Sequence, residues 1–348
     1  MSMGGPSALA DSIQPWRVEA VQRLGFTERQ ARFLVHVLVH SGVFLERQYR
    51  LFSGFKHGHN TQTFLRTLIE RKYATAITPG KLHTGRLYHV QFKPLYETIG
   101  EPDNRNRRSV ALGRMIERLM LLDVVLGDKS HTWLATEKDK LAYFRAVDIF
   151  GRRLDDAYYP RLLFGEGVRR TIRYFPDKLP IGLELGNGRS RHVFVYLVRQ
   201  TNPNDFRLWL LRHGELFRAL HEWTVRIVFP KRLYKARALH LWAFRDDLRT
   251  RLSFSAAQEF EWYLRVRHGR HLTDTTTPPY ATFEEAAKKF RGARFRALEH
   301  VWLQGDSTVI DGAASPTISD KLARGLGQVE IIVLPHQYLQ LTSLVGVA

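Results

Sequence analysis

The order of hydrophobic periodicities in the first hundred residues constrains the fold of this chain more than any other feature. Three stretches with apolar residues at helical spacing come first, and two stretches with strand character follow. We expect helices at 27–41, about 45–52 and about 61–72, and strands at 74–78 and 86–92. Helix, helix, helix and hairpin within about 70 residues is the order of a winged helix-turn-helix.

The termini of these helices have recognisable residues. Thr27 can cap the first helix, and Gly42 can end it. We expect Asn60 to cap the third helix. The buried stripe of that helix should contain five apolar side chains: Phe64, Leu65, Leu68, Ile69 and Tyr73.

In a winged helix the third helix enters the major groove, and the wing contacts the backbone or the minor groove. Gln pairs with adenine and Arg with guanine, whereas residues just before the helix usually meet phosphate. The candidate DNA-binding residues are Lys56, His57, His59, Asn60, Thr61, Gln62, Thr63, Arg66 and Thr67 around the helix, and Lys81, His83, Thr84 and Arg86 on the expected wing.

This region has two other interpretations. Winged helices also bind proteins, in which case these side chains are ordinary solvated groups. His57 and His59 have the H-x-H spacing of metal ligands, but no carboxylate or cysteine lies beside them. We therefore expect no metal site there, and no cofactor elsewhere in the chain.

The charge favours a polyanionic partner. Lys and Arg number 53 and Asp and Glu 34, which gives a net charge of +19. The excess is +5 in residues 1–104, +6 in 105–175 and +8 in 176–348, so it is spread along the chain. A basic body indicates a broad nucleic-acid-binding surface. The alternative is an arginine-rich protein from a GC-rich genome.

Composition excludes several classes of protein. The chain has 348 residues and no cysteine, which excludes disulfides, a cysteine nucleophile and cysteine-ligated metal. No apolar run approaches a membrane span of about 20 residues, and the N-terminus lacks the pattern of a signal peptide. We expect a bacterial, cytoplasmic and nucleoid-associated protein with no membrane partner and no evident small-molecule substrate.

The second half of the chain has the element order hairpin, helix, strand, helix. Strands are expected at 179–185, 191–198 and 224–230, with an amphipathic helix at 205–223. This order indicates a mixed sheet covered by helices. From 207 to 251 there are 11 basic and 4 acidic residues among three tryptophans, which we expect in the core.

This order resembles restriction-endonuclease-like, or PD-(D/E)xK, domains. With the N-terminal winged helix, residues 25–245 resemble the replication-relaxation family of plasmids and mobile elements. The resemblance implies a winged helix followed by a nuclease-like domain. Such nucleases use an acidic residue before one strand and a (D/E)-x-K set on the next, which hold Mg²⁺ and activate water.

The residues at those positions do not complete the set. Asp177 stands where the first acid is expected, and Glu184 lies on the strand after it. The next strand, HVFVYLV, has Tyr196 and Val198 at the family's acidic and lysine positions. We therefore expect no catalytic residues and no enzyme, with Asp177 and Glu184 kept as the alternative catalytic pair.

The sequence thus predicts an α+β protein with an N-terminal winged helix-turn-helix and a mixed α/β restriction-endonuclease-like domain. The expected parts are a DNA-binding domain at 1–104, connecting helices at 105–160, and a nuclease-like domain with a C-terminal extension at 161–348. The expected function is double-stranded DNA binding, as a homodimer, in transcription regulation or in replication or transfer control of a plasmid or mobile element. The alternatives are a Mg²⁺-dependent nuclease with a divergent site and a protein-interaction scaffold.

Overall fold

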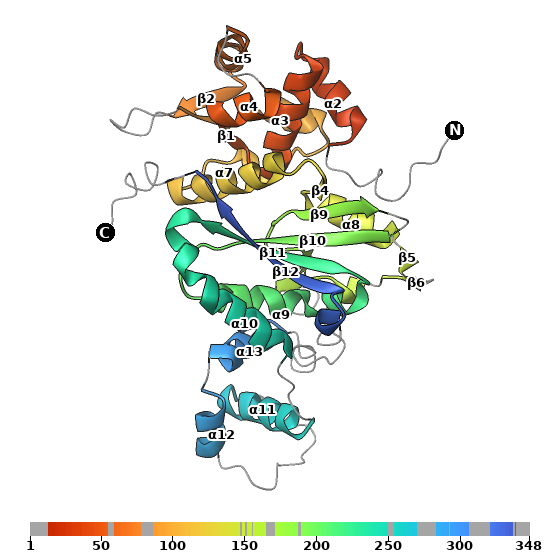
Figure 1. The fold of residues 1–348 in the computed structure, drawn as a ribbon, viewed down its shortest axis with the longest axis vertical. Coiled ribbons are helices and arrows are strands. Elements are labelled where there is room, and N and C mark those ends of the chain that lie inside the picture. The colour runs from red at the N-terminus through yellow and green to blue at the C-terminus, as the bar shows by residue number, and fades with distance from the viewer. Residues whose placement is uncertain are drawn as a thin grey trace.

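The computed structural model is an α+β fold with several sheets, in which one helix, α7 (Leu112–Gly127), lies between an N-terminal unit and a larger sheet (Figure 1). We call residues 13–104 the N-terminal unit. The structure describes residues 13–54, 59–77, 86–146, 148–149, 152–154, 156–164, 171–186, 189–249, 254–269, 283–291, 293–305, 321–336 and 338.

The N-terminal unit contains five helices and a three-stranded sheet among its described residues. The elements are α2 (Pro15–Gln22), α3 (Glu28–His40), β1 (Val43–Leu45), α4 (Glu46–Ser53), α5 (His59–Glu70), β2 (Ala74–Ile77), β3 (Leu87–Val90) and α6 (Lys93–Thr98). The sheet has the order β1-β3-β2, with both pairs antiparallel. The expected helices and strands are therefore present, and α2, β1 and α6 are additions that the periodicity did not reveal.

Helix α3 begins with a reciprocal cap, as the sequence predicts. The Thr27 hydroxyl accepts a hydrogen bond from the Gln30 backbone N–H at 3.4 Å. The Gln30 side-chain carbonyl accepts one from the Thr27 N–H at 3.0 Å. Two backbone donors that have no acceptor inside the helix are thereby satisfied. Phe33, at the centre of α3, packs against the rings of Phe44 and Tyr49 at centroid distances of 5.2 and 5.0 Å.

Helix α5 departs from the expectation in two respects. It begins at His59, so Asn60 lies inside the first turn and is not its cap. Several residues in a first turn have free backbone N–H groups, so residue type alone locates a boundary only within one or two positions. Ile69, expected in the buried stripe, is 39% exposed.

The segment between the N-terminal unit and α7 is bound closely to α3. The Asn106 side-chain amide donates to the carbonyl oxygens of Leu38 and Val39, both at 3.1 Å. These are carbonyls of the last turn of α3, which lack partners within the helix. The Asn106 carbonyl accepts in turn from the Arg118 guanidinium of α7 at 3.2 Å. The expected boundary between residues 104 and 105 therefore falls in a segment that is fixed to both α3 and α7.

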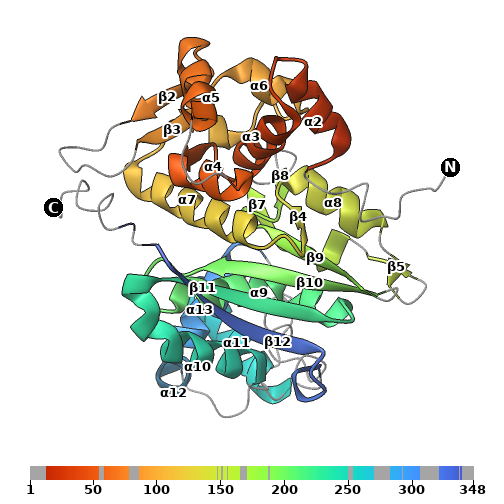
Figure 2. The ribbon, with the colours of Figure 1, turned by 45° about the horizontal axis from the view of Figure 1, so that its top comes forward.

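Helix α7 contributes to two hydrophobic cores. Leu122 and Leu126 pack in the core of the N-terminal unit. A second cluster joins other α7 side chains, including Ile116, to Val43 of β1 and Val195 of the larger sheet. The helix is therefore a layer shared by the N-terminal unit and the larger sheet (Figure 2).

The larger sheet has five strands in the order β12-β11-β10-β9-β4. Their bounds are β4 (Thr132–Leu134), β9 (Ile181–Gly186), β10 (Arg189–Leu197), β11 (Trp223–Pro230) and β12 (Gly327–Leu334). β10, β11 and β12 are parallel neighbours, whereas β9 is antiparallel to both β10 and β4. β4 lies within residues 105–160, so this segment supplies an edge strand and is not made of connecting helices alone. β12 pairs with β11 and completes the sheet from the expected C-terminal extension.

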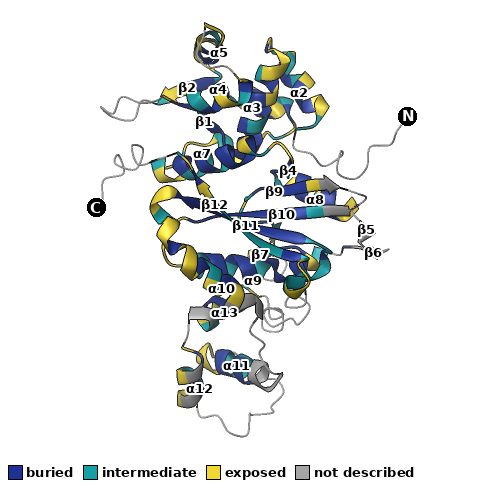
Figure 3. Ribbon diagram, viewed as in Figure 1, coloured by how far each residue is buried: buried dark blue, intermediate teal, exposed yellow. Residues whose placement is uncertain are grey.

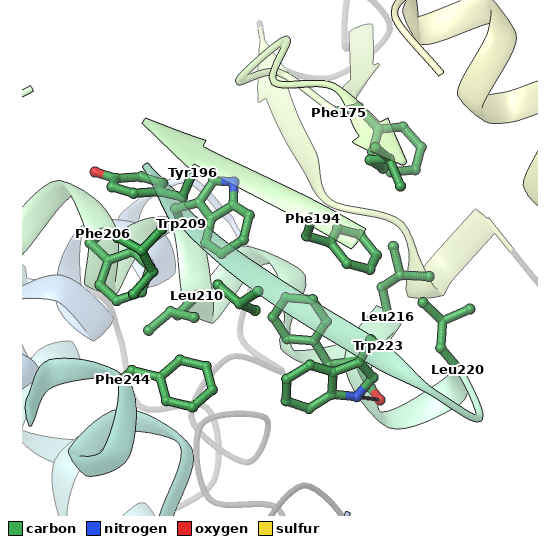
Figure 4. Close-up of a cluster of buried hydrophobic side chains, with 14 of the residues drawn as sticks. Phe175, Phe194, Tyr196, Phe206, Trp209, Leu210, Leu216, Leu220, Trp223 and Phe244 are labelled. Atoms are coloured by element: carbon green, nitrogen blue, oxygen red, sulfur yellow. Dashed lines mark hydrogen bonds between the residues drawn. The ribbon is translucent and has the colours of Figure 1, made fainter. Parts of the chain in front are cut away.

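The two faces of the sheet pack against different helices. α9 (Asn204–Ala219) and α10 (Arg237–Arg249) lie on the face opposite α7 (Figure 2). Successive side chains of a strand point to opposite faces. Accordingly Phe194 and Tyr196 join the aromatic cluster with α9, and Val195 packs in the cluster that contains α7 (Figure 4).

The remaining elements lie outside the two sheets described so far. They are η1 (Arg105–Arg107), α8 (Glu137–Ala146), β5 (Asp148–Ile149), β6 (Arg152–Arg153), η2 (Asp156–Tyr158), β7 (Arg161–Phe164), β8 (Thr171–Tyr174), η4 (Lys231–Ala236), α11 (Phe254–Arg267), α12 (Phe283–Lys289) and α13 (Ala293–Leu303). β5 pairs with β6, and β7 pairs with β8. Helices α11, α12 and α13 form a separate cluster that reaches α9 through Leu211.

A buried histidine of β10 makes stability depend on pH. His192 is 4% exposed, and its Nδ1–H donates to the Glu222 carbonyl at 3.3 Å. Its Nε2 accepts from the Tyr143 hydroxyl at 3.0 Å, so the neutral ring satisfies both contacts. Burial lowers the pKa of His192 from 6.5 to about 4, although the bond to Glu222 acts in the opposite direction.

We expect acidification from pH 7 to pH 5 to remove about 2 kcal/mol of stability through His192. The unfolded chain takes up the proton near pH 6.5 and the folded chain only near pH 4, so stability is lost as pH falls through this interval. The measurement is urea unfolding at both pH values for the unmodified chain and for His192→Gln. Equal pH dependence in the two proteins would contradict the assignment, because other histidines contribute to both alike.

Candidate nucleic-acid interface

Helix α5 is held against the N-terminal unit by one apolar side. Phe64, Leu65 and Leu68 are at most 3% exposed. The Phe64 ring lies 4.3 Å from the ring of Tyr49 in α4 and 6.1 Å from that of Phe26, measured between centroids. These contacts fix the orientation of α5 about its own axis and so determine which side chains remain outside.

The opposite side of α5 is polar and accessible. His59, Asn60, Gln62 and Arg66 are exposed, and Thr63 and Thr67 are half-buried. The Thr67 hydroxyl donates its proton to the Thr63 carbonyl at 2.9 Å. A ligand could therefore use this hydroxyl only as a hydrogen-bond acceptor. Figures 1 and 3 show α5 at the edge of the molecule, away from the larger sheet.

The positive charge of Arg66 is available to a ligand. Its Nε lies 4.0 Å from the Glu70 carboxylate, and both side chains are more than 60% exposed. An exposed pair at this distance contributes little to stability. The guanidinium can therefore leave Glu70 for a phosphate or a guanine edge at small cost.

Thr61 does not belong to this accessible face. It is 1% exposed, and its hydroxyl has no hydrogen-bond partner among the described residues. The prediction of a DNA contact by Thr61 is therefore wrong. Three residues before Phe64 on the same helix, Thr61 shares the buried side because positions i and i+3 lie on one face.

The other expected contacts lie partly beyond the described residues. Lys56 and His57 precede α5, and Lys81, His83 and Thr84 belong to the expected wing; all five are outside the ranges that the structure describes. Arg86 is exposed immediately before β3. It stands where β3 begins, the strand that pairs with both β1 and β2.

Two cationic residues at the end of α5 were not among the candidates. Arg71 is exposed, and its Nη1 donates to the Leu24 carbonyl at 2.8 Å. Lys72 is exposed with φ of +56°, at the turn that follows the helix, where glycine is usual. In the sequence these two residues could have been recognised as an adjacent basic pair directly after Glu70, near the end of the apolar stripe of α5.

The alternative catalytic carboxylates have separate surroundings. Asp177 lies four residues before β9, where its Oδ1 accepts the Leu179 backbone N–H at 3.0 Å. Its Oδ2 is 3.4 Å from His213 Nε2 of α9. Glu184 is exposed within β9, opposite Arg191 of β10 in the strand register. The part of the chain that the structure describes has no group of three His, Asp or Glu side chains that could hold a metal ion.

Asp177 lies beside two buried basic side chains, Lys140 and His213. Lys140 is 1% exposed and donates from Nζ to the Leu179 carbonyl at 2.6 Å. Burial lowers the pKa of Lys140 and lowers that of His213 to about 4, and the Asp177 charge opposes both shifts. Asp177 thus accepts a backbone N–H, and the His213 ring beside it is neutral at pH 7, with its Nδ1–H donated to the Trp209 carbonyl at 2.8 Å.

The strand that would carry the (D/E)-x-K set is apolar in its central positions. Tyr196 is 5% exposed and packs against Phe206 and Trp209 at centroid distances of 4.7 and 5.3 Å (Figure 4). Val198 is 1% exposed. Val198 has no group that could bind a metal ion, and burial raises the pKa of the Tyr196 hydroxyl, so the two side chains do not replace the missing carboxylate and lysine.

No helix in the described residues has the length and apolarity needed to cross a membrane. Comparison of the chain with protein-family models, with curated proteins and with solved structures found no match.

Proposed function

We propose that this chain binds double-stranded DNA and that α5 is its recognition helix. One observation carries the proposal: α5 buries Phe64, Leu65 and Leu68, whereas Gln62 and Arg66 on its outer side are exposed and unpacked. A helix needed only for packing does not require this pair of base-reading side chains. The net charge of +19 supports a polyanionic partner.

The order of elements supports a winged helix-turn-helix in the N-terminal unit. The chain runs α3, β1, α4, α5, β2, β3, and the sheet order is β1-β3-β2. In that fold the helix corresponding to α5 enters the major groove and the loop between the last two strands forms the wing. The wing here falls between β2 and β3.

The order of the larger sheet supports a nuclease-like domain. In this sheet β4, β9 and β10 are antiparallel neighbours, and α9 then leads to β11, which is parallel to β10. Helix α8 and the hairpins β5–β6 and β7–β8 stand between β4 and β9 in the chain. The apolar β10 supports binding without cleavage. From the resemblance to the replication-relaxation family we infer the process, which is transcription regulation, or replication or transfer control of a plasmid or mobile element, by a homodimer.

Selection of bound fragments from random and bacterial DNA, with and without Mg²⁺, tests this proposal. Enrichment of a common sequence without cleavage is the expected result. Cleavage that requires Mg²⁺ and disappears in Asp177→Ala would instead establish a nuclease. Undetectable DNA binding at low salt would favour a protein-interaction scaffold. The mass in solution, with and without the selected fragment, tests the homodimer.

Arg66→Ala is expected to weaken binding to the selected duplex by about 1–3 kcal/mol and to relax sequence preference at one position. The change removes a base or phosphate contact while α5 keeps its packing. The measurement is a titration of labelled duplex at fixed salt. Arg114→Ala on α7 is the matched control, since Arg114 is 57% exposed and is also paired with a nearby glutamate. Equal affinities of the Arg66 and Arg114 variants would show that the recognition face is wrongly assigned.

A further inference from the structure

A second basic surface lies on η4 and the first part of α10. The sequence from 231 to 245, KRLYKARALHLWAFR, contains five Lys or Arg residues and no Asp or Glu. We define the η4–α10 surface by its exposed members: Lys231, Arg232, Tyr234, Lys235, Arg237, Leu239, Trp242 and Arg245. Figure 3 shows exposed residues along the segment that leads from β11 into α10.

The sequence 231–245 places no acidic residue among the five cations of this surface; Asp246 and Asp247 follow directly, and their side chains lie outside the described ones. None of the five cations forms an ion pair with a residue whose side chain the structure describes, whereas most other arginines near the sheet do; Arg226 and Arg199 are examples. Five clustered cations outnumber the two carboxylates that follow them in the sequence, and such an excess raises the local positive potential and attracts a polyanion.

Trp242 sets this surface apart from an ordinary solvated face. Of the three tryptophans expected in the core, Trp209 and Trp223 are buried, but Trp242 is 56% exposed. The expectation is therefore wrong for Trp242. The guanidinium of Arg207, itself 3% exposed, lies 4.7 Å from the centre of the Trp242 ring. Because a buried cation lies over one face of the indole, solvent reaches the ring from the other side.

A second aromatic side chain accompanies it. Tyr234 is 38% exposed, and the Arg237 guanidinium lies 4.3 Å from its ring centre. Leu239, 49% exposed, belongs to the same surface. Guanidinium planes and aromatic rings are the groups on which unpaired bases stack in proteins.

The place of this surface in the fold is a usual one for ligands. η4 begins directly after β11, at the carboxyl end of a strand with a parallel neighbour on each side. Ligands of open α/β sheets bind outside the carboxyl ends of such strands.

We propose that the η4–α10 surface binds single-stranded nucleic acid, with Trp242 stacking on a base and Lys231, Arg232 and Lys235 contacting phosphates. Exposed rings favour a single strand over a duplex, because the faces of paired bases are already stacked. This proposal goes beyond duplex binding by α5 and does not depend on it. The two surfaces belong to different units of the fold.

The experiment measures the affinity of the full chain for a short labelled oligothymidylate over a range of salt concentrations. Trp242→Ala is expected to weaken binding by about 5- to 150-fold, the effect of losing one stacked base. Trp242→Phe should retain most of the affinity. The double change Lys231→Gln and Arg232→Gln should reduce the slope of log K against log salt by about 1.4, as expected for two lost phosphate contacts to a single strand.

Trp16→Ala is the matched control. Trp16 is 45% exposed and also has an arginine over its ring, but it lies in α2 without a basic cluster. Its removal should leave oligothymidylate binding unchanged. Equal affinity of Trp242→Ala and the unmodified chain would overturn the proposal. So would Trp242-dependent binding that is tighter to anionic lipid vesicles or to polyglutamate than to oligothymidylate.

The outcomes separate the two proposals. Arg66→Ala should leave oligothymidylate binding intact, and Trp242→Ala should leave binding of the selected duplex intact. If no duplex is selected but Trp242-dependent binding of oligothymidylate remains, the proposed function fails and the single-strand site stands.

Discussion

Asp123→Ala is expected to lower the free energy of unfolding by about 3–5 kcal/mol, because it removes one partner of a largely buried ion pair. Asp123 is 8% exposed on α7. Its carboxylate accepts two hydrogen bonds from the Arg47 guanidinium, at 2.8 and 2.6 Å, and one from the Gln48 amide at 2.8 Å. The Tyr338 hydroxyl donates to it as well. The change would leave these donors without their acceptor, and urea unfolding at pH 7 measures the loss.

Glu117→Ala provides the control on the same helix. Glu117 pairs with Arg114 at 2.6 Å near the surface, and removal of such a pair costs about 1 kcal/mol or less. A cycle of Asp123→Ala, Arg47→Ala and the double variant should give a coupling energy of about 2 kcal/mol or more. If Asp123→Ala lowers the free energy of unfolding no more than Glu117→Ala does, the Asp123 carboxylate does not stabilise the packing of α7 on the N-terminal unit.

Gly42→Ala is expected to lower the free energy of unfolding by roughly 3 kcal/mol or more. Gly42 has φ of +74°, a conformation that strains any residue with a Cβ atom. A Cβ atom there would also overlap the backbone carbonyl of Asn106. To remove this overlap, Asn106 would have to move away from the last turn of α3 and lose its hydrogen bonds to Leu38 and Val39. The cost of these bonds adds to the cost of the backbone strain. Urea unfolding again gives the measurement.

Gly113→Ala is the matched control for this substitution. Gly113 lies in α7 without positive φ, and a Cβ atom added there would meet no atom within 4 Å. Alanine in a helix is favoured over glycine by about 0.5–1 kcal/mol, so this variant should be equally stable or more stable. A similar loss in both variants would mean that the close approach at Asn106 is not maintained in solution.

Local signals in the sequence predicted the elements that local interactions determine. Thr27 and Gln30 are three residues apart and cap α3 without help from the rest of the chain, so the start of this helix was predictable. β1 was not, because its three residues become a strand only by pairing with β3, more than 40 residues later. The partner of β12 was likewise hidden, since parallel pairing with β11 depends on the whole sheet.

The exposed face of α5 was predicted except at Thr61, which is buried, and at Ile69, which is exposed. Helical spacing placed Gln62 and Arg66 outside and Phe64 inside. Thr61 lies three residues before Phe64 and shares the buried side, whereas its polar side chain had favoured the exposed side. Trp242 shows the opposite case: its hydrophobicity favoured the core, and the packing of α10 on α9 left it outside.

The shared packing of α7 has a consequence for anyone who divides this chain. A cut before α7 would strip Leu122 and Leu126 from the core of the N-terminal unit. A cut after it would expose Val195 and Val228 of the larger sheet, which pack in the cluster that contains α7. Neither fragment would keep a complete interior, so each should be poorly soluble when produced alone. A chimaera that exchanges the N-terminal unit must therefore carry α7 and match its apolar side chains on both faces.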